Sequence, residues 1–128
     1  WYEEKNLAEY EDGDPYEWLK QLGGYAPIIH LQQTDGKTSS HLPFTEKYNK
    51  RGIIEGKKVL KALAQSYNQN YDENNSFPPQ CEKIYLTLEI FSGTSEKPHH
   101  IIDTLEKSVA YWRNFIPEDG LSLKNLIK

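Results

Sequence analysis

The residues with the clearest chemical potential are one histidine and one glutamate, each near the end of a predicted β-strand. His30 lies in the apolar segment 26–33, and Glu89 lies in the segment 84–91. Neighbouring parallel strands lie about 4.8 Å apart, so an imidazole and a carboxylate on adjacent strand ends could reach one cation. Zinc, for example, binds both ligand types at roughly 2.0–2.2 Å. The pair therefore predicts half of a metal site.

The two candidates differ in how strongly the sequence supports them. Along 84–91 aliphatic side chains alternate with a mixed set, and Glu89 belongs to the mixed face. Burying an unpaired carboxylate is costly, so a glutamate within an otherwise apolar strand favours a functional role. His30 has a simpler alternative, because an inward histidine is often a hydrogen-bonded core group. Both interpretations of His30 stay open at this point.

Alternating helices and strands are predicted to position these side chains. The Asp14-Pro15 pair is typical of a helix start, because Asp caps and Pro suits the first helical position. Strand and helix alternation predicts parallel strands joined by crossovers. The strands are predicted over 26–33 and 84–91, the helices over 15–22, 53–67, 98–115 and 121–127, and the loops over 1–13, 37–51 and 68–82.

The two faces of segment 84–91 favour a closed barrel over a doubly wound sheet. In a doubly wound sheet both faces pack on helices, where a charge is costly. In a (β/α)8 TIM barrel the mixed face looks inward, and Glu89 would lie at the carboxyl end of its strand, where such barrels have active sites. We therefore predict an α/β fold, a (β/α)8 TIM barrel of which this chain is a part.

The composition is that of one acidic globular domain. The chain has 128 residues, 27% charged and 37% hydrophobic, which excludes fibrous and disordered classes. A formal net charge of −4 argues against a DNA-backbone binder, which needs a basic face. No segment approaches the roughly 20 apolar residues of a membrane span. We therefore expect neither nucleic acid nor membrane as a partner.

The sulfur-containing residues give two further expectations. A single cysteine, Cys81, cannot form an internal disulfide, so a reducing compartment, the cytoplasm, is expected. The sequence contains no methionine, which favours a chain that is the carboxyl-terminal part of something longer.

Two stretches of the sequence carry a resemblance to a known family. Residues 28–36 have the sequence IIHLQQTDG and are followed by HLPFT at 41–45. The second stretch is LEIF at 88–91, followed by a predicted helix that ends with YWR at 111–113. Their order and spacing resemble the sugar phosphate isomerase/epimerase family of xylose isomerase-like barrels, the second stretch being similar to that family's closing strand and helix. The resemblance implies that residues 1–128 are the C-terminal part of a single barrel domain, with its last two or so βα units.

The resemblance implies one divalent metal ion, such as Mn, Mg, Zn or Co, held by Glu, Asp, His and Glu from the last four strands. His30 matches the histidine ligand, and Glu89 matches the last glutamate, which is both ligand and acid/base. The implied reaction removes a proton next to a carbonyl and passes through a metal-stabilised enediolate. The substrate would be a sugar or sugar phosphate, and the choice between isomerase and epimerase stays open.

The resemblance also implies some less specific roles. Gln32 could orient a substrate hydroxyl, and His41, with Phe44 as a lid contact, could cover a bound sugar. The cations Lys37, Lys50 and Arg51 could contact a phosphate, although exposed cations usually only solvate a loop. Barrels of this kind often form dimers or tetramers, so a homo-oligomer is a further expectation.

Two alternatives to a sugar isomerase or epimerase are carried forward. One is a non-catalytic, barrel-derived binding or interaction module, which would need neither metal nor Glu89. The other is a metal-dependent endonuclease of the same barrel superfamily. The acidic composition and the one candidate histidine ligand make the endonuclease the weaker of the two.

Overall fold

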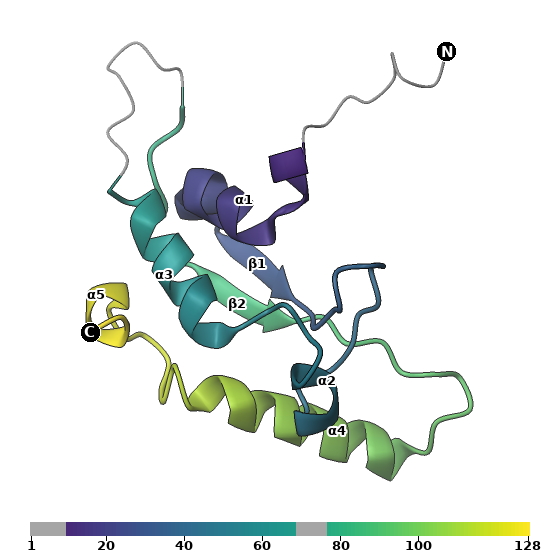
Figure 1. Cartoon of the computed structure of the whole chain (residues 1–128). Helices are drawn as coiled ribbons and strands as arrows, with labels where there is room; N and C mark the ends of the chain where they lie inside the picture. The colour runs from purple at the N-terminus through teal and green to yellow at the C-terminus, as the bar shows by residue number, and fades with distance from the viewer. Residues whose placement is uncertain (1–9, 69–76) are drawn as a thin grey trace, which may run out of the picture.

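Two short parallel strands form the sheet in the computed structural model, which describes residues 10–68 and 77–128 (Figure 1). Strand β1 is Ile28–Leu31 and strand β2 is Tyr85–Leu88, paired in register from Ile28 opposite Tyr85 to Leu31 opposite Leu88. The predicted parallel pairing is therefore confirmed. The fold class is α/β with a small parallel sheet, whereas closure into a barrel and the assignment of 1–128 to one barrel domain stay predictions.

The helices follow the predicted order along the chain. They are α1 (Pro15–Leu22), α2 (Glu46–Asn49), α3 (Gly56–Ser66), α4 (Pro98–Arg113) and α5 (Leu123–Leu126), with short 3-10 helices at Tyr10–Gly13 and Gly23–Tyr25. Helix α1 begins as expected, because the carboxylate of Asp14 accepts a hydrogen bond of 2.8 Å from the amide of Tyr16. Among the described residues, no helix has the length and apolar character needed to cross a membrane.

Several predicted boundaries were wrong: both strands are shorter than the predicted 26–33 and 84–91, and α3, α4 and α5 are shorter than predicted. Helix α3 starts three residues later than expected, because the amides of Ile53 and Ile54 bond back to Thr34 and Gln33 and so leave the helical path. The segment predicted as loop 37–51 contains the short helix α2. Residues 1–9 and 69–76, predicted as parts of loops, lie outside the described residues.

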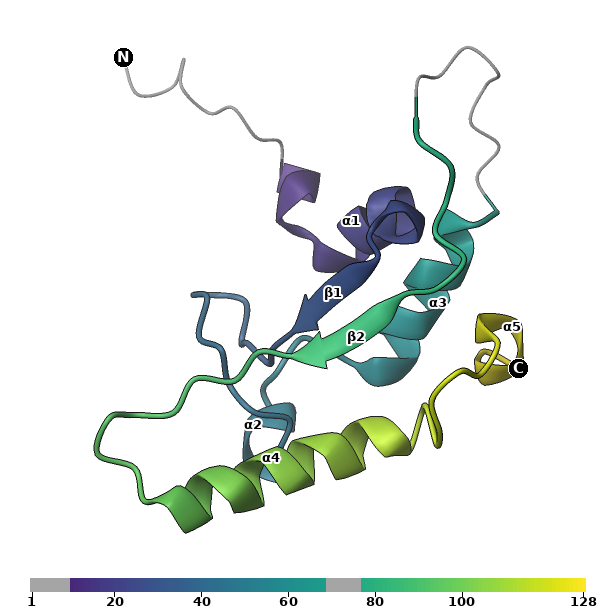
Figure 2. The same cartoon turned by 180° about the vertical axis from the view of Figure 1, so that it is seen from behind.

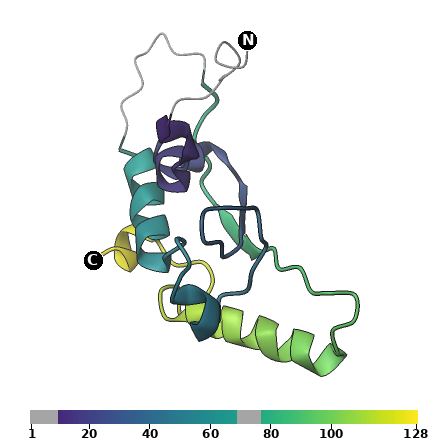
Figure 3. The same ribbon diagram turned by 45° about the vertical axis from the view of Figure 1, so that its right-hand side comes forward.

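The helices cover one face of the sheet and leave the other open. Helices α1 and α3 lie side by side against one face (Figure 3), and the view from behind shows the strands in front of them (Figure 2). Gly23 permits the close approach to α3, since a Cβ there would come 2.5 Å from Cδ2 of Leu63. Burial alternates accordingly, with Leu31 buried and Ile28 56% exposed.

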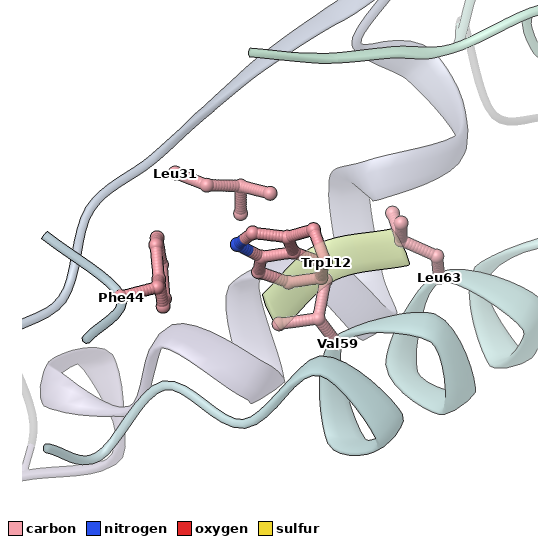
Figure 4. Close-up of a cluster of buried hydrophobic side chains, with 5 residues drawn as sticks. All are labelled: Leu31, Phe44, Val59, Leu63 and Trp112. Atoms are coloured by element: carbon pink, nitrogen blue, oxygen red, sulfur yellow. The ribbon is translucent and has the colours of Figure 1, made fainter. Parts of the chain in front are cut away.

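The core lies between the covered face of the sheet and the helices. Its buried apolar side chains come from β1, from the loop that precedes α2, and from α3 and α4 (Figure 4). They are Leu31, Phe44, Val59, Leu63 and Trp112. The core holds one face of each strand against the helices. The opposite faces, which carry the candidate side chains, therefore point away from the helices.

Candidate active site at the carboxyl ends of the strands

The sheet brings the two predicted site residues together. Glu89 directly follows β2, and its amide donates a 2.9 Å hydrogen bond to the carbonyl oxygen of Leu31, which extends the parallel ladder by one step. His30 lies on β1 opposite Thr87. Nδ1 of His30 lies 3.6 Å from Oε2 of Glu89. The spacing of adjacent strands thus delivers the imidazole–carboxylate pair that the sequence predicted.

Both side chains lie on the face that the helices leave open. The His30 side chain is 60% exposed and that of Glu89 is 36% exposed. The aliphatic residues Leu86 and Leu88 pack instead against the core. The predicted division of this strand into an aliphatic and a mixed face is therefore confirmed. His30 is thus exposed in this structure, and its two interpretations, metal ligand or hydrogen-bonded core histidine, both stay predictions.

A second imidazole reaches the same carboxylate oxygen. Nε2 of His41 lies 3.6 Å from Oε2 of Glu89, and the His41 side chain is only 19% exposed. Its ring stacks on that of Phe91, with centroids 4.0 Å apart and planes 2° apart. The loop after β1 thus folds back over the end of β2. The sequence analysis missed Phe91, although strand alternation already placed it on the same face as Glu89.

Gln32 lies beside this group and is engaged with the loop. Its side-chain oxygen accepts a 2.6 Å hydrogen bond from the amide of His41, and its side-chain nitrogen lies 3.5 Å from Oγ of Ser39. The structure therefore brings Gln32 and His41 to the site, while their roles toward a substrate stay predictions.

The loop that carries His41 is anchored by a residue that the sequence analysis did not single out. Gln33 is 1% exposed, and its backbone pairs with Leu42 through hydrogen bonds of 2.8 and 3.0 Å. Its side-chain nitrogen donates to Asn49 and to the carbonyl of Ile54, and its side-chain oxygen accepts from the amides of Thr34 and Ile54. The only signal in the sequence was a polar residue that strand alternation placed on the same face as Ile29 and Leu31, opposite to His30 and Gln32.

One expected contact is wrong. Phe44 was expected to be a lid contact over a sugar, but it is 1% exposed and packs between Tyr111 and Trp112 in the core. Its amide donates to the buried hydroxyl of Ser108, which holds this segment on α4. A large apolar side chain beside a proline gains more by burial than by covering a polar ligand.

The three loop cations give no support to a phosphate site. Lys37, Lys50 and Arg51 are all exposed. Lys50 lies 2.8 Å from the carboxylate of Glu46, one helical turn away. Their contact with a phosphate stays a prediction.

The donor set at Glu89 and His30 suits part of a divalent metal site. Two ligands of one tetrahedral zinc, at about 2.0–2.2 Å each, lie roughly 3.3–3.6 Å apart, close to the observed 3.6 Å between Nδ1 and Oε2. Imidazole suits Zn, Cu, Fe and Ni, and carboxylate suits Mg, Ca and Mn. No group of three or more His, Cys, Asp or Glu side chains within the described ranges is arranged to hold a metal ion. The geometry of the pair therefore fits two ligands of one metal ion, and metal binding itself stays a prediction.

Comparison with known proteins supports the class of protein that the two sequence stretches indicated. No family model matches the chain. The resemblance to sugar phosphate epimerases is nevertheless confirmed by a curated relative. That relative is D-erythrulose 1-phosphate 3-epimerase of Brucella abortus (strain 2308), which is 29% identical over 117 residues. The match covers 91% of this chain and 34% of the relative, so the chain spans about a third of the length of the protein it matches.

Proposed function

We propose that this chain supplies part of the active site of a metal-dependent epimerase or isomerase that acts on a sugar or sugar phosphate. The observation that carries the proposal is the 3.6 Å contact between Glu89 and His30 at the carboxyl ends of two parallel strands, on the open face of the sheet. In parallel α/β folds this end of the strands is where ligands bind. The similarity to a sugar phosphate epimerase supports the substrate class.

Glu89 is the proposed acid/base of the reaction. Its carboxylate would accept the proton from the carbon next to a ketose carbonyl, while the C–H electron pair moves toward the carbonyl to give an enediolate. Delivery of a proton by a second carboxylic acid to the opposite face of the same carbon would give the epimer, whereas delivery to the adjacent carbon would give the isomer. His30 and Glu89 would hold a divalent cation, which when bound supplies electrostatic stabilisation of the developing oxyanion.

The surrounding residues would serve this chemistry by holding the acid/base in place. The ladder hydrogen bond from the Glu89 amide to Leu31 fixes the backbone of the acid/base to the sheet. The stacked pair of His41 and Phe91 borders it on one side. A fixed carboxylate lowers the cost of aligning it with the carbon–hydrogen bond.

The experiment uses the intact protein that contains this chain. We expect a bound divalent metal by elemental analysis, and exchange of the proton at carbon 3 of D-erythrulose 1-phosphate with solvent deuterium by NMR. Glu89→Gln keeps the size of the side chain but removes its basicity, so we expect the exchange rate to fall about 10²–10⁴-fold. Glu106→Gln, the same exchange at an exposed position on α4, is the matched control and should leave the rate unchanged.

Two results would count against the proposal. Full turnover by Glu89→Gln would reject the catalytic assignment. Absence of both metal and proton exchange, with a range of ketoses and ketose phosphates, would favour the non-catalytic binding module instead.

A further inference from the structure

We infer that His41 is a positioning residue for Glu89, whose fixed imidazole holds the carboxylate beside His30, an inference that rests on the proposed function of Glu89. The two imidazoles contact the same oxygen, Oε2 of Glu89, each at 3.6 Å. The two rings differ in solvent exposure: the side chain of His30 is 60% exposed, whereas that of His41 is 19% exposed. The carboxylate thus lies between an exposed imidazole, that of His30, and a largely enclosed one, that of His41.

The backbone of His41 is held in a conformation that it would not adopt freely. Its φ is 47°, in the left-handed region that non-glycine residues rarely adopt. Two hydrogen bonds stabilise it, one from its amide to the side chain of Gln32 (2.6 Å) and one from the amide of Phe91 to its carbonyl (3.1 Å). Among the described non-glycine residues, His41 alone has positive φ. Strain of this kind persists only where the surroundings impose it, and it is concentrated at functional sites.

The ring of His41 is fixed as firmly as its backbone. One face stacks on Phe91, and Nδ1 lies 3.3 Å from the carbonyl oxygen of Ser39. Nδ1 thus faces a carbonyl oxygen while Nε2 lies 3.6 Å from Oε2 of Glu89, so each ring nitrogen has an oxygen neighbour. The Gln33–Leu42 backbone pair, immediately beside His41, ties the same loop to the end of β1. Stacking, the Ser39 contact and the tied loop therefore hold the imidazole against the carboxylate.

This arrangement favours a role of His41 in positioning Glu89 over a role in binding the substrate. A ring that is stacked on one side and engaged at both nitrogens has little contact surface left for a sugar. A rigid neighbour reduces the number of carboxylate orientations that must be sampled before proton transfer. Outer residues that orient a metal ligand typically contribute about 10–100-fold in metal affinity or activity.

The test measures kcat, KM and Mn²⁺ affinity of the intact protein with His41→Phe and His41→Gly. The phenylalanine keeps the stacking on Phe91 and removes both nitrogens. The glycine suits the positive φ, so it folds even if His41→Phe does not. For both variants we expect kcat for carbon-3 exchange to fall about 10–100-fold, Mn²⁺ binding measured by calorimetry to weaken about tenfold, and KM to stay within about threefold.

His100→Phe, at an exposed histidine near the start of α4, is the matched control and should leave all three values unchanged. Wild-type kcat and Mn²⁺ affinity in both His41 variants would overturn the positioning role. Unchanged kcat with a raised KM would also overturn it, and would make His41 a substrate-binding residue. Full turnover by Glu89→Gln would overturn the proposed function instead, whatever the His41 variants do.

Discussion

At the residue scale, the side chain of Gln33 connects strand β1 to the chain that enters α3. It is fully buried, and both its amide oxygen and its amide nitrogen make two hydrogen bonds. Gly52 lies against it, because a Cβ at this position would come 2.1 Å from Cδ of Gln33. Leaving a buried polar group unsatisfied costs about 1–3 kcal/mol, so this contact cannot be relaxed without loss.

We therefore predict that Gly52→Ala lowers the free energy of unfolding by about 2–4 kcal/mol, because the new methyl group must displace a fully bonded side chain. Urea denaturation followed by circular dichroism measures the effect. Gly93→Ala is the control, because a Cβ at Gly93 would meet nothing within 4 Å. Equal stability of the two variants would show that Gln33 moves aside at little cost.

The same residues show what a single sequence can and cannot reveal at this scale. Glu89 and His30 were predictable because a charged or ionisable group in an apolar strand is unusual, and strand alternation gives its face. The anchoring role of Gln33 was not predicted, because the sequence does not show whether a glutamine side chain is buried with four hydrogen bonds or exposed to solvent. The strained backbone of His41 left no local signal either, because it is imposed by Gln32 and by Phe91, fifty residues further along the chain.

At the element scale, strand β1 is stabilised through one face only. Leu31 is 5% exposed and packs in the core, whereas Ile28, at the other end of the strand, is 56% exposed on the open face. Deleting buried methylene and methyl groups costs both transfer free energy and a cavity. The two residues have side chains of the same size, so they form a matched pair.

We predict that Leu31→Ala destabilises this chain by about 2–5 kcal/mol, while Ile28→Ala changes its stability by less than about 1 kcal/mol. Thermal or urea unfolding of the two variants gives the comparison. A large loss in Ile28→Ala in the intact protein, but not in the 128-residue chain, would show that further structure covers this face. Similar losses in both variants of the 128-residue chain would contradict the one-sided packing.

The elements themselves were largely predictable, and their ends were not. The start of α1 followed from Asp14 and Pro15, whose cap the structure confirms, and α4 followed from Pro98 and its apolar spacing. The start of α3 could not be predicted from local sequence, because it depends on a tertiary contact. The amide of Glu55 donates a hydrogen bond to the hydroxyl of Tyr16, which lies in α1. Tertiary hydrogen bonds outweighed helix propensity there.

At the scale of the whole molecule, the order and parallel direction of the elements were predicted because helix–strand alternation permits few topologies. The open face of the sheet, with Ile28, Tyr85 and Phe91 exposed, accords with a strand pair that has further partners. Closure into a barrel could not be read from these two strands, because it depends on the number and tilt of all the strands in the sheet.

The tie between α1 and the segment before α3 is one tyrosine hydroxyl. Tyr16 donates to the carbonyl of Ile53 at 2.6 Å and accepts from the amide of Glu55 at 2.8 Å. Burial raises the pKa of Tyr16 above its ordinary value of 10.0. Burial likewise raises the pKa of Tyr67, whose hydroxyl donates to the carbonyl of Cys81. The protonated hydroxyls therefore hold together segments that are distant in the sequence.

Because the pKa of each tyrosine is higher in the folded state than in the unfolded state, the folded state binds more protons above pH 10. The contribution to stability is fully present below pH 10 and is lost as pH rises through the folded pKa. We predict that the free energy of unfolding falls steadily above pH 10, and that the fall is shallower in Tyr16→Phe. Urea titrations at pH values from 8 to about 11.5, the range that brackets tyrosine ionisation, measure both slopes. An equal slope in the variant would mean that the Tyr16 hydroxyl ionises without disturbing the junction of α1 with α3.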